Sequence, residues 1–95
     1  MLTNLLEKVE KELKIPKEKI IEQGVQRFLE SEVKNFSAEI AKIGIKYGVN
    51  SFNELWNKFE RGEVSESECF DDLTKLEYLE LEKEKILNLL REVKG

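Results

Sequence analysis

The stretch that decides the fold runs from Pro16 to Gly48 and reads P-K-E-K-I-I-E-Q-G-V-Q-R-F-L-E-S-E-V-K-N-F-S-A-E-I-A-K-I-G-I-K-Y-G. Its apolar residues recur at steps of three or four, which is the spacing of one helical face. They are Ile21, Val25, Leu29, Val33, Phe36, Ile40, Ile43 and Tyr47. Pro16 suits the first turn of a helix, and Gly48 suits a left-handed cap at its end. The pattern therefore predicts one long helix from Lys17 to Tyr47.

A continuous helix of that length does not fit inside a compact domain. Residues 17–47 would span about 46 Å at about 1.5 Å per residue. A compact chain of 95 residues has a radius of gyration of only about 12 Å and a diameter near about 30 Å. We therefore expect the helix to project, to bend or to lie along a partner. The sequence leaves its continuity open at Gly24, Ser37 and Gly44.

A shorter helix is expected on the N-terminal side of this stretch. The apolar residues Leu5, Leu6, Val9 and Leu13 share one helical face over residues 3–14. Ile15 precedes a proline, and a residue in that position disfavours helical geometry. We therefore expect two helices that meet at Ile15.

Two capping boxes open two further helices after Gly48. In the first box the Ser51 hydroxyl caps the helix start while Glu54 reaches back, and Ser65 with Glu68 forms the second box. The first of these helices is short, carries the aromatic cluster and ends at Gly62. Its aromatic residues Phe52, Trp56 and Phe59 are interpreted mainly as core, with a binding hot spot as the alternative.

The last helix is expected to run to about Val93 without a break. Phe70, Leu73, Leu76, Leu79, Ile86, Leu90 and Val93 form its main apolar stripe, and Leu81, Leu87 and Leu89 widen it. Such a wide stripe favours a helical homodimer, in addition to packing within the chain.

Charge is abundant and unevenly distributed. Asp, Glu, Lys and Arg make up 38% of the chain, and the net charge is −4. Between Glu60 and Glu84, ten acidic residues stand against three basic ones, so this segment alone carries −7. The Glu- and Lys-rich composition resembles that of proteins from hot environments. An acidic segment of this kind favours association with a basic partner, whereas a solvated helix face is the simpler interpretation.

The cysteine count and the distribution of apolar residues indicate the cellular compartment of the protein. Cys69 is the single cysteine, so no internal disulfide is possible. No apolar run approaches the roughly 20 residues of a membrane span, and charges come too early for a secretory signal. We therefore expect a cytoplasmic protein without a membrane association.

The residues offer little for catalysis. Histidine is absent, which excludes Ser-His-Asp and Cys-His chemistry, and no Gly-rich phosphate loop is present. The remaining candidate is a magnesium site like that of all-helical nucleotide pyrophosphatases, built on Glu68 with Asp71 or on Glu77 with Glu80. A second acidic pair is missing from the inward face of the long helix: Glu30 and Glu32 are the nearest residues, and they are not three or four positions apart. We therefore expect no enzyme activity, no cofactor and no metal.

Nucleic-acid binding is a secondary expectation. The pI is near 5.0, and no basic stripe is interleaved with aromatic residues. A dimer would concentrate the lysines near the N-terminus, so DNA binding stays open. Those lysines are Lys11, Lys14, Lys17 and Lys19.

Several stretches resemble a known family. They are L-K-I-P (13–16) with I-I-E-x-G-V-x-x-F-L (20–29), K-Y-G-V-x-S-x-x-E-L (46–55) and G-E-V-S-E (62–66). Together they are similar to small archaeal antitoxin-like proteins of type II toxin–antitoxin pairs. The resemblance implies a protein that blocks a small toxic enzyme, often an RNase. It covers capping and core residues, so it implies no site residues, and the chain lacks the N-terminal strand of a ribbon-helix-helix DNA-binding end.

The sequence thus predicts a single all-α domain over residues 1–95: a hairpin of two long helices, a short bridging helix and an N-terminal helix, assembled as a homodimer. The expected function is a non-enzymatic, antitoxin-like interaction module that neutralises a basic toxic enzyme through an acidic helix. The alternatives are a magnesium-dependent nucleotide pyrophosphatase and a structural coiled-coil adaptor. The residues expected to bind the partner are Glu77, Glu80, Glu84, Trp56 and Phe59.

Overall fold

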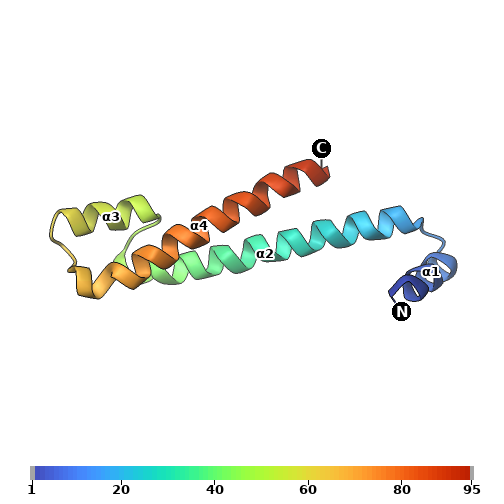
Figure 1. Cartoon of the computed structure of the whole chain (residues 1–95), viewed down its shortest axis with the longest axis horizontal. Helices are drawn as coiled ribbons and strands as arrows, with labels where there is room; N and C mark the ends of the chain where they lie inside the picture. The colour runs from blue at the N-terminus through green and yellow to red at the C-terminus, as the bar shows by residue number, and fades with distance from the viewer. Residues whose placement is uncertain (1, 95) are drawn as a thin grey trace.

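The computed structural model describes residues 2–94, and this part of the chain contains four α-helices and no strand (Figure 1). They are α1 (Leu2–Leu13), α2 (Lys17–Tyr47), α3 (Phe52–Glu60) and α4 (Glu66–Lys94). Helices α2 and α4 run antiparallel as a long hairpin, α3 lies beside the first half of α4, and α1 lies at the far end of α2 (Figure 1). The predicted all-α class, the long-helix hairpin and the short bridging helix are confirmed.

Helix α2 has the predicted bounds and passes without a break through Gly24, Ser37 and Gly44. It ends at Gly48, whose φ of 68° and ψ of 38° give the left-handed cap expected from the sequence. The chain measures 62 × 26 × 17 Å, with a radius of gyration of 19.5 Å, against about 12 Å for a compact domain of this length. The long helix therefore projects from the rest of the chain.

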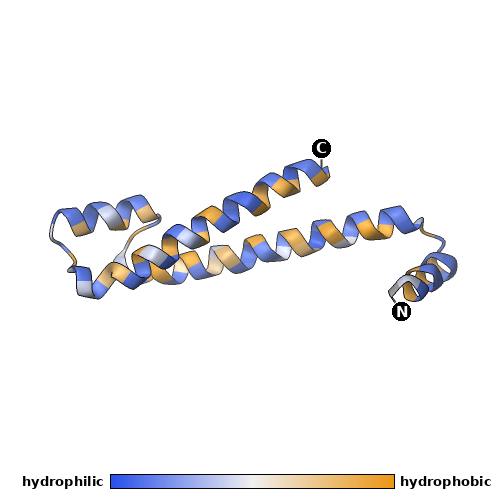
Figure 2. Cartoon of the chain, viewed as in Figure 1, coloured by the Kyte–Doolittle hydropathy of each residue, from blue (hydrophilic) through white to orange (hydrophobic). Residues whose placement is uncertain are grey.

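The core lies at the α3 end of the hairpin, where three helices meet. Its buried residues come from α2, α3, α4 and the α2–α3 loop: Ile43, Val49, Leu55, Cys69, Leu73, Leu76 and Leu79. Figure 2 shows the hydrophobic sides of α2 and α4 facing each other along the hairpin. Burial of these side chains, worth about 1.5–3 kcal/mol for each large one, holds α3 and the two long helices together.

Two aromatic residues differ from the expected core. Phe70 was expected in the stripe of α4, yet 58% of it is exposed, because the buried face of the helix begins one position earlier, at Cys69. Trp56 is 41% exposed because the fully buried Leu55 occupies the centre of the inward face of α3. The interpretation of Trp56 as a core residue is therefore wrong, and the indole lies at the edge of the core.

Charged side chains from other helices cap both ends of α2. The Glu10 carboxylate accepts a hydrogen bond of 2.7 Å from the Lys17 N–H at the start of α2. Lys58 donates to the Tyr47 carbonyl at the end of α2, at 2.9 Å. Acidic groups at N-terminal ends and basic groups at C-terminal ends complement the helix dipole, so these contacts fix how the helices join.

Both predicted serine caps are present, and in each box the glutamate carboxylate makes a different contact from the one expected. The Ser51 hydroxyl accepts from the Glu54 N–H at 3.2 Å, while the Glu54 carboxylate accepts from the Asn50 N–H, one residue before the cap. Ser65 accepts from the Glu68 N–H at 3.3 Å and donates to the Glu68 carboxylate at 2.8 Å. These contacts satisfy N–H groups that a helix start leaves without partners.

Gly44 is a packing site rather than a weak point of α2. The residue is buried, and its carbonyl accepts a 2.9 Å hydrogen bond from the Val49 N–H as the chain turns back. A Cβ at this position would collide with the carbonyl oxygen of Val49. The absence of a side chain at Gly44 therefore allows the loop to close against the helix.

No helix within residues 2–94 is long and apolar enough to cross a membrane.

Candidate protein-interaction surface

The five residues predicted to bind a partner come from two neighbouring helices. Trp56 and Phe59 lie on α3, whereas Glu77, Glu80 and Glu84 lie on α4. The Phe59 ring lies 5.5 Å from the Trp56 ring. Phe52 connects the two groups, because its ring stacks on Trp56 at 6.2 Å while its N–H bonds to Glu80. The structure therefore brings the predicted residues to the same part of the hairpin.

Two of the five residues have roles within the fold. Glu80 is half-buried, and its carboxylate accepts a 2.8 Å hydrogen bond from the Phe52 N–H at the start of α3. Phe59 is half-buried and packs against the core. Trp56, Glu77 and Glu84 are exposed, and a partner would reach these three most easily.

Glu84 lies close to the region where α3 begins. It lines a surface hollow together with Ser51, Glu80 and Lys83. The basic Lys83 therefore shares this hollow with the two carboxylates. Glu77 lies outside the hollow, one helical turn before Glu80 on α4.

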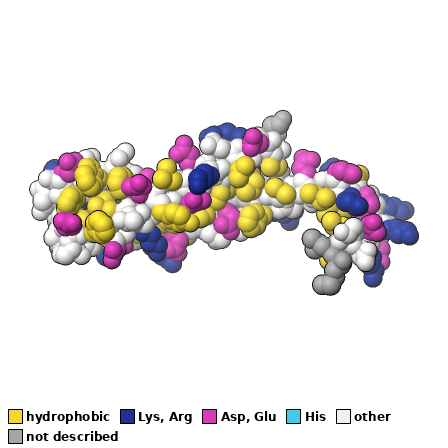
Figure 3. Space-filling model, in the orientation of Figure 1, with side chains coloured by type: hydrophobic (Ala, Val, Ile, Leu, Met, Phe, Trp, Pro, Cys, Tyr) yellow, Lys and Arg dark blue, Asp and Glu magenta, His cyan; other side chains and the backbone are white. Residues whose placement is uncertain are grey.

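The acidic character of this end is stronger than the three predicted glutamates suggest. Of the ten acidic residues in residues 60–84, Asp72, Glu63 and Glu82 form ion pairs, and Glu68 and Glu80 cap helices. The remaining five are exposed and have no ionic partner within the described chain. These five, called the acidic set below, are Glu60, Glu66, Asp71, Glu77 and Glu84. Figure 3 shows acidic and hydrophobic side chains next to one another on the visible face of this end.

A polar network that sequence reasoning missed joins α2 to α4 in the same region. Lys46 donates to the Asp72 carboxylate at 2.8 Å, and the Tyr47 hydroxyl lies 2.5 Å from the same oxygen. The Tyr47 hydroxyl also lies 2.9 Å from the Glu68 carbonyl, which can accept its proton instead. The hydrogen bond from Lys46 and the one from Tyr47 hold the pKa of Asp72 below its ordinary value of 3.8. Nothing in the spacing of the sequence links residue 46 to residue 72, so only the three-dimensional register reveals the network.

Cys69 is a structural residue. The side chain is fully buried, and burial raises the pKa of its thiol. A raised pKa leaves little of the reactive thiolate at neutral pH. Cys69 is therefore a small buried residue of the core rather than a reactive thiol.

The described residues contain no group of three or more Asp, Glu, Cys or His side chains that could hold a metal ion. The magnesium site considered as an alternative would need such a group around Glu68 with Asp71 or around Glu77 with Glu80. No observation therefore favours the nucleotide pyrophosphatase alternative.

Comparisons with known proteins give a family and one relative. The family described as "Uncharacterized protein MJ0235 family" matches residues 1–95. The "Uncharacterized protein MJ0235" of Methanocaldococcus jannaschii is 36% identical over 76 residues, which cover 80% of this chain and 93% of that protein. No solved structure matches the chain. The predicted resemblance to small archaeal proteins is confirmed, whereas neither description mentions an antitoxin, which stays a prediction.

Proposed function

The chain belongs to the MJ0235 family, and we propose that it acts as a non-enzymatic interaction module that binds a basic protein through the α3–α4 end of its hairpin. In its antitoxin-like form, the proposal is that this partner is a small toxic enzyme, such as an RNase, which the chain neutralises. The single observation that supports the proposal most is the acidic set: five exposed carboxylates without an ionic partner among residues 2–94.

Electrostatics explain why such a surface would select a basic partner. The segment from Glu60 to Glu84 carries −7, and side chains engaged in the fold account for only half of its acidic groups. A cluster of unneutralised charge of one sign steers a complementary partner and rejects like-charged ones. An enzyme that acts on RNA needs a basic groove for phosphates, and an acidic helix is complementary to such a groove.

The aromatic residues beside the acidic set would supply the rest of the binding energy. Trp56 is 41% exposed and is held in place by its stacking on Phe52. Interface energy concentrates in a few large aromatic or Arg side chains surrounded by weaker contacts. We therefore propose Trp56 as the apolar anchor and the nearby carboxylates of α4 as the determinants of partner choice.

The experiment that tests this function is co-expression with the product of the adjacent gene, followed by affinity purification and a growth assay. The chain should co-purify with that product and relieve its toxicity. A variant with Asp71→Lys, Glu77→Lys and Glu84→Lys should lose both properties. Glu80 stays unchanged in this variant because its carboxylate caps α3.

The matched control carries the same change of charge elsewhere on the chain. Glu7, Glu12 and Glu92 are exposed and lie on α1 and at the end of α4. Their reversal to Lys should leave both co-purification and neutralisation intact. The antitoxin-like proposal fails if the adjacent product is harmless or does not bind, and the assigned surface is wrong if both reversed variants bind equally well.

A further inference from the structure

An apolar face at the opposite end of the molecule has no partner within the described chain. It lies on α1 and on residues 17–28 of α2. We call residues 17–28, the projecting stretch of α2, the arm. Five large apolar side chains on this face are between 44% and 63% exposed: Leu5, Leu13, Ile21, Val25 and Phe28. Figure 1 shows the arm extending beyond the end of α4, with α1 at its tip.

The arm continues the apolar row that elsewhere packs against α4. The row steps from Ile21 to Val25 and then to Leu29, which is buried. The Lys94 ammonium lies 3.7 Å from the Glu30 carboxylate, so the described part of α4 reaches only this level of α2. From Leu29 onward a facing helix covers the row, and before Leu29 the same row faces solvent.

The surface area of the chain indicates how much a partner would need to cover. A compact monomer of 11.2 kDa exposes about 5,700 Å², whereas this chain exposes 7292 Å², which leaves an excess of about 1,600 Å². If each of two copies buried this excess, the interface would total about 3,200 Å². Permanent homodimer interfaces bury about 2,000–5,000 Å² in total and are more apolar than transient ones. A second copy of the chain therefore fits the size and the character of the surplus surface.

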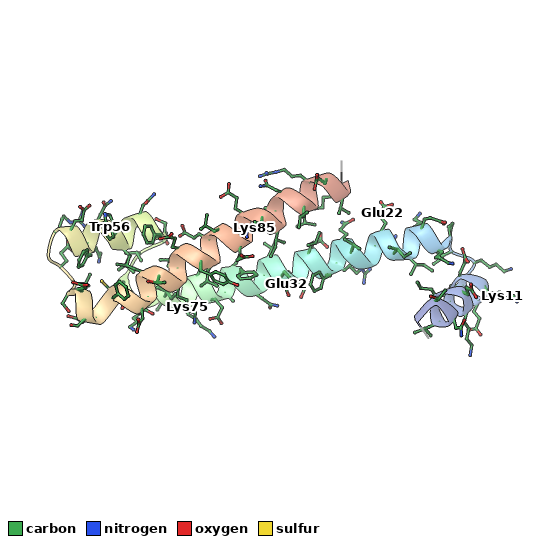
Figure 4. The ribbon with its side chains drawn as sticks, in the orientation of Figure 1. Lys11, Glu22, Glu32, Trp56, Lys75 and Lys85 are labelled. Atoms are coloured by element: carbon green, nitrogen blue, oxygen red, sulfur yellow. The ribbon has the colours of Figure 1, made fainter. Side chains whose placement is uncertain are left out.

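The charges along α2 favour an antiparallel arrangement of the two arms. Residues 14–19, where the arm begins, are basic. They contain Lys14, Lys17 and Lys19 against the single acidic residue Glu18. Beyond the other end of the arm lie Glu30 and Glu32. Figure 4 shows Lys11 on α1, Glu22 on the arm and Glu32 within the hairpin. Arg27 and Lys34 flank Glu30 and Glu32, so the contrast lies between single side chains. In an antiparallel pair the lysines at the start of each arm come close to Glu30 and Glu32 of the other copy, whereas a parallel pair would place the lysines of both copies together.

We infer that this chain forms a two-fold symmetric homodimer in which the apolar faces of two arms pack antiparallel against each other. Each arm then takes the place that α4 holds further along α2. The inference uses residues that the acidic set does not include, so it stands or falls separately from the proposed function.

The test measures molar mass by size exclusion with light scattering over a concentration series. The wild-type chain should be a dimer. The variant Val25→Glu with Phe28→Glu should be a monomer at the same concentrations, with a dimer dissociation constant raised at least about 100-fold. Its far-UV circular dichroism should be unchanged, because both side chains are exposed in the single chain.

Three further variants test the location of the dimer surface and the orientation of the two arms. Ile45 is an apolar residue of α2 that is 84% exposed outside the arm, so Ile45→Glu should leave the dimer intact. Lys17→Glu alone should raise the dissociation constant by about fivefold, and the combination with Glu32→Lys should restore it. A monomeric wild type, a dimer that survives the arm variant, or a dimer that Ile45→Glu disrupts would overturn the inference. A charge swap that fails to restore the dimer would overturn the antiparallel arrangement.

Discussion

Asp72 shows, at the scale of single residues, how the fold sets the chemistry of a side chain. Its carboxylate accepts from Lys46 on α2, and this contact lowers the pKa of Asp72 below 3.8. A carboxyl group with a lowered folded-state pKa stabilises the fold above its unfolded-state pKa of about 3.9, and the stabilisation disappears as the pH falls through the folded-state value. The contribution of Asp72 should therefore be present at neutral pH and absent in strong acid.

We predict that Asp72→Asn lowers the free energy of unfolding at pH 7, and that this difference disappears in strong acid, once the pH has fallen through the lowered folded-state pKa of Asp72. Urea denaturation at several pH values measures the difference between the variant and the wild type. Asp71→Asn is the matched control, because its side chain is exposed and has no ionic partner in residues 2–94. A difference that stays constant down to strong acid would show that the charge of Asp72 does not matter.

The two helical glycines of α2 make a second prediction at the residue scale. Gly44→Ala should destabilise the fold by about 1–3 kcal/mol, because a Cβ meets the Val49 carbonyl in a packed site. In the monomeric Val25→Glu, Phe28→Glu background, Gly24→Ala should stabilise the fold by up to about 1 kcal/mol, because no atom of the same chain lies within 4 Å of an added Cβ. Urea titrations at one protein concentration measure both. Equal effects of the same sign would contradict the close approach at Gly44.

At the scale of helices, the sequence predicted existence and boundaries well because local signals set both. The period of the apolar row, Pro16 and Gly48 together define α2, and the two serine capping boxes define where α3 and α4 begin. Contacts between helices could not be predicted from the sequence. Lys58 and Glu10 bond to the two ends of α2, and no local pattern connects them to these positions. The same limit explains why Glu80 was assigned to a partner, although its carboxylate caps α3.

Helix α3 depends on that cap, which makes a prediction at the scale of the element. Glu80→Ala should destabilise α3 by about 1–2 kcal/mol, because the Phe52 N–H loses a charged acceptor. Amide hydrogen exchange should quicken throughout α3 (Phe52–Glu60). Glu77→Ala, one turn away and exposed, should leave this exchange unchanged. Similar rates in the two variants would contradict the role of Glu80 as a cap.

The molecule as a whole is a rod with two unlike ends. The α3–α4 end holds the core and the acidic set, whereas the arm carries an apolar face outside the core. The sequence predicted that the long helix would project, bend or lie along a partner, because its length exceeds the diameter of a compact domain, and in the structure it projects. It did not predict which part would project, since this depends on the level at which α4 pairs with α2, and the pairing at Glu39 with Lys75 and at Glu30 with Lys94 is visible only in three dimensions. In our account, the chain binds itself at one end and a basic protein at the other.

The most direct test of this account is the molar mass, by light scattering, of the chain co-expressed with the product of the adjacent gene. The variant Val25→Glu with Phe28→Glu should lose the mass of the second copy and keep the partner. The variant with Asp71, Glu77 and Glu84 reversed to Lys should remain a dimer and lose the partner. If one variant lost both masses, or if both variants kept the full wild-type mass, the chain would not have two separate binding surfaces.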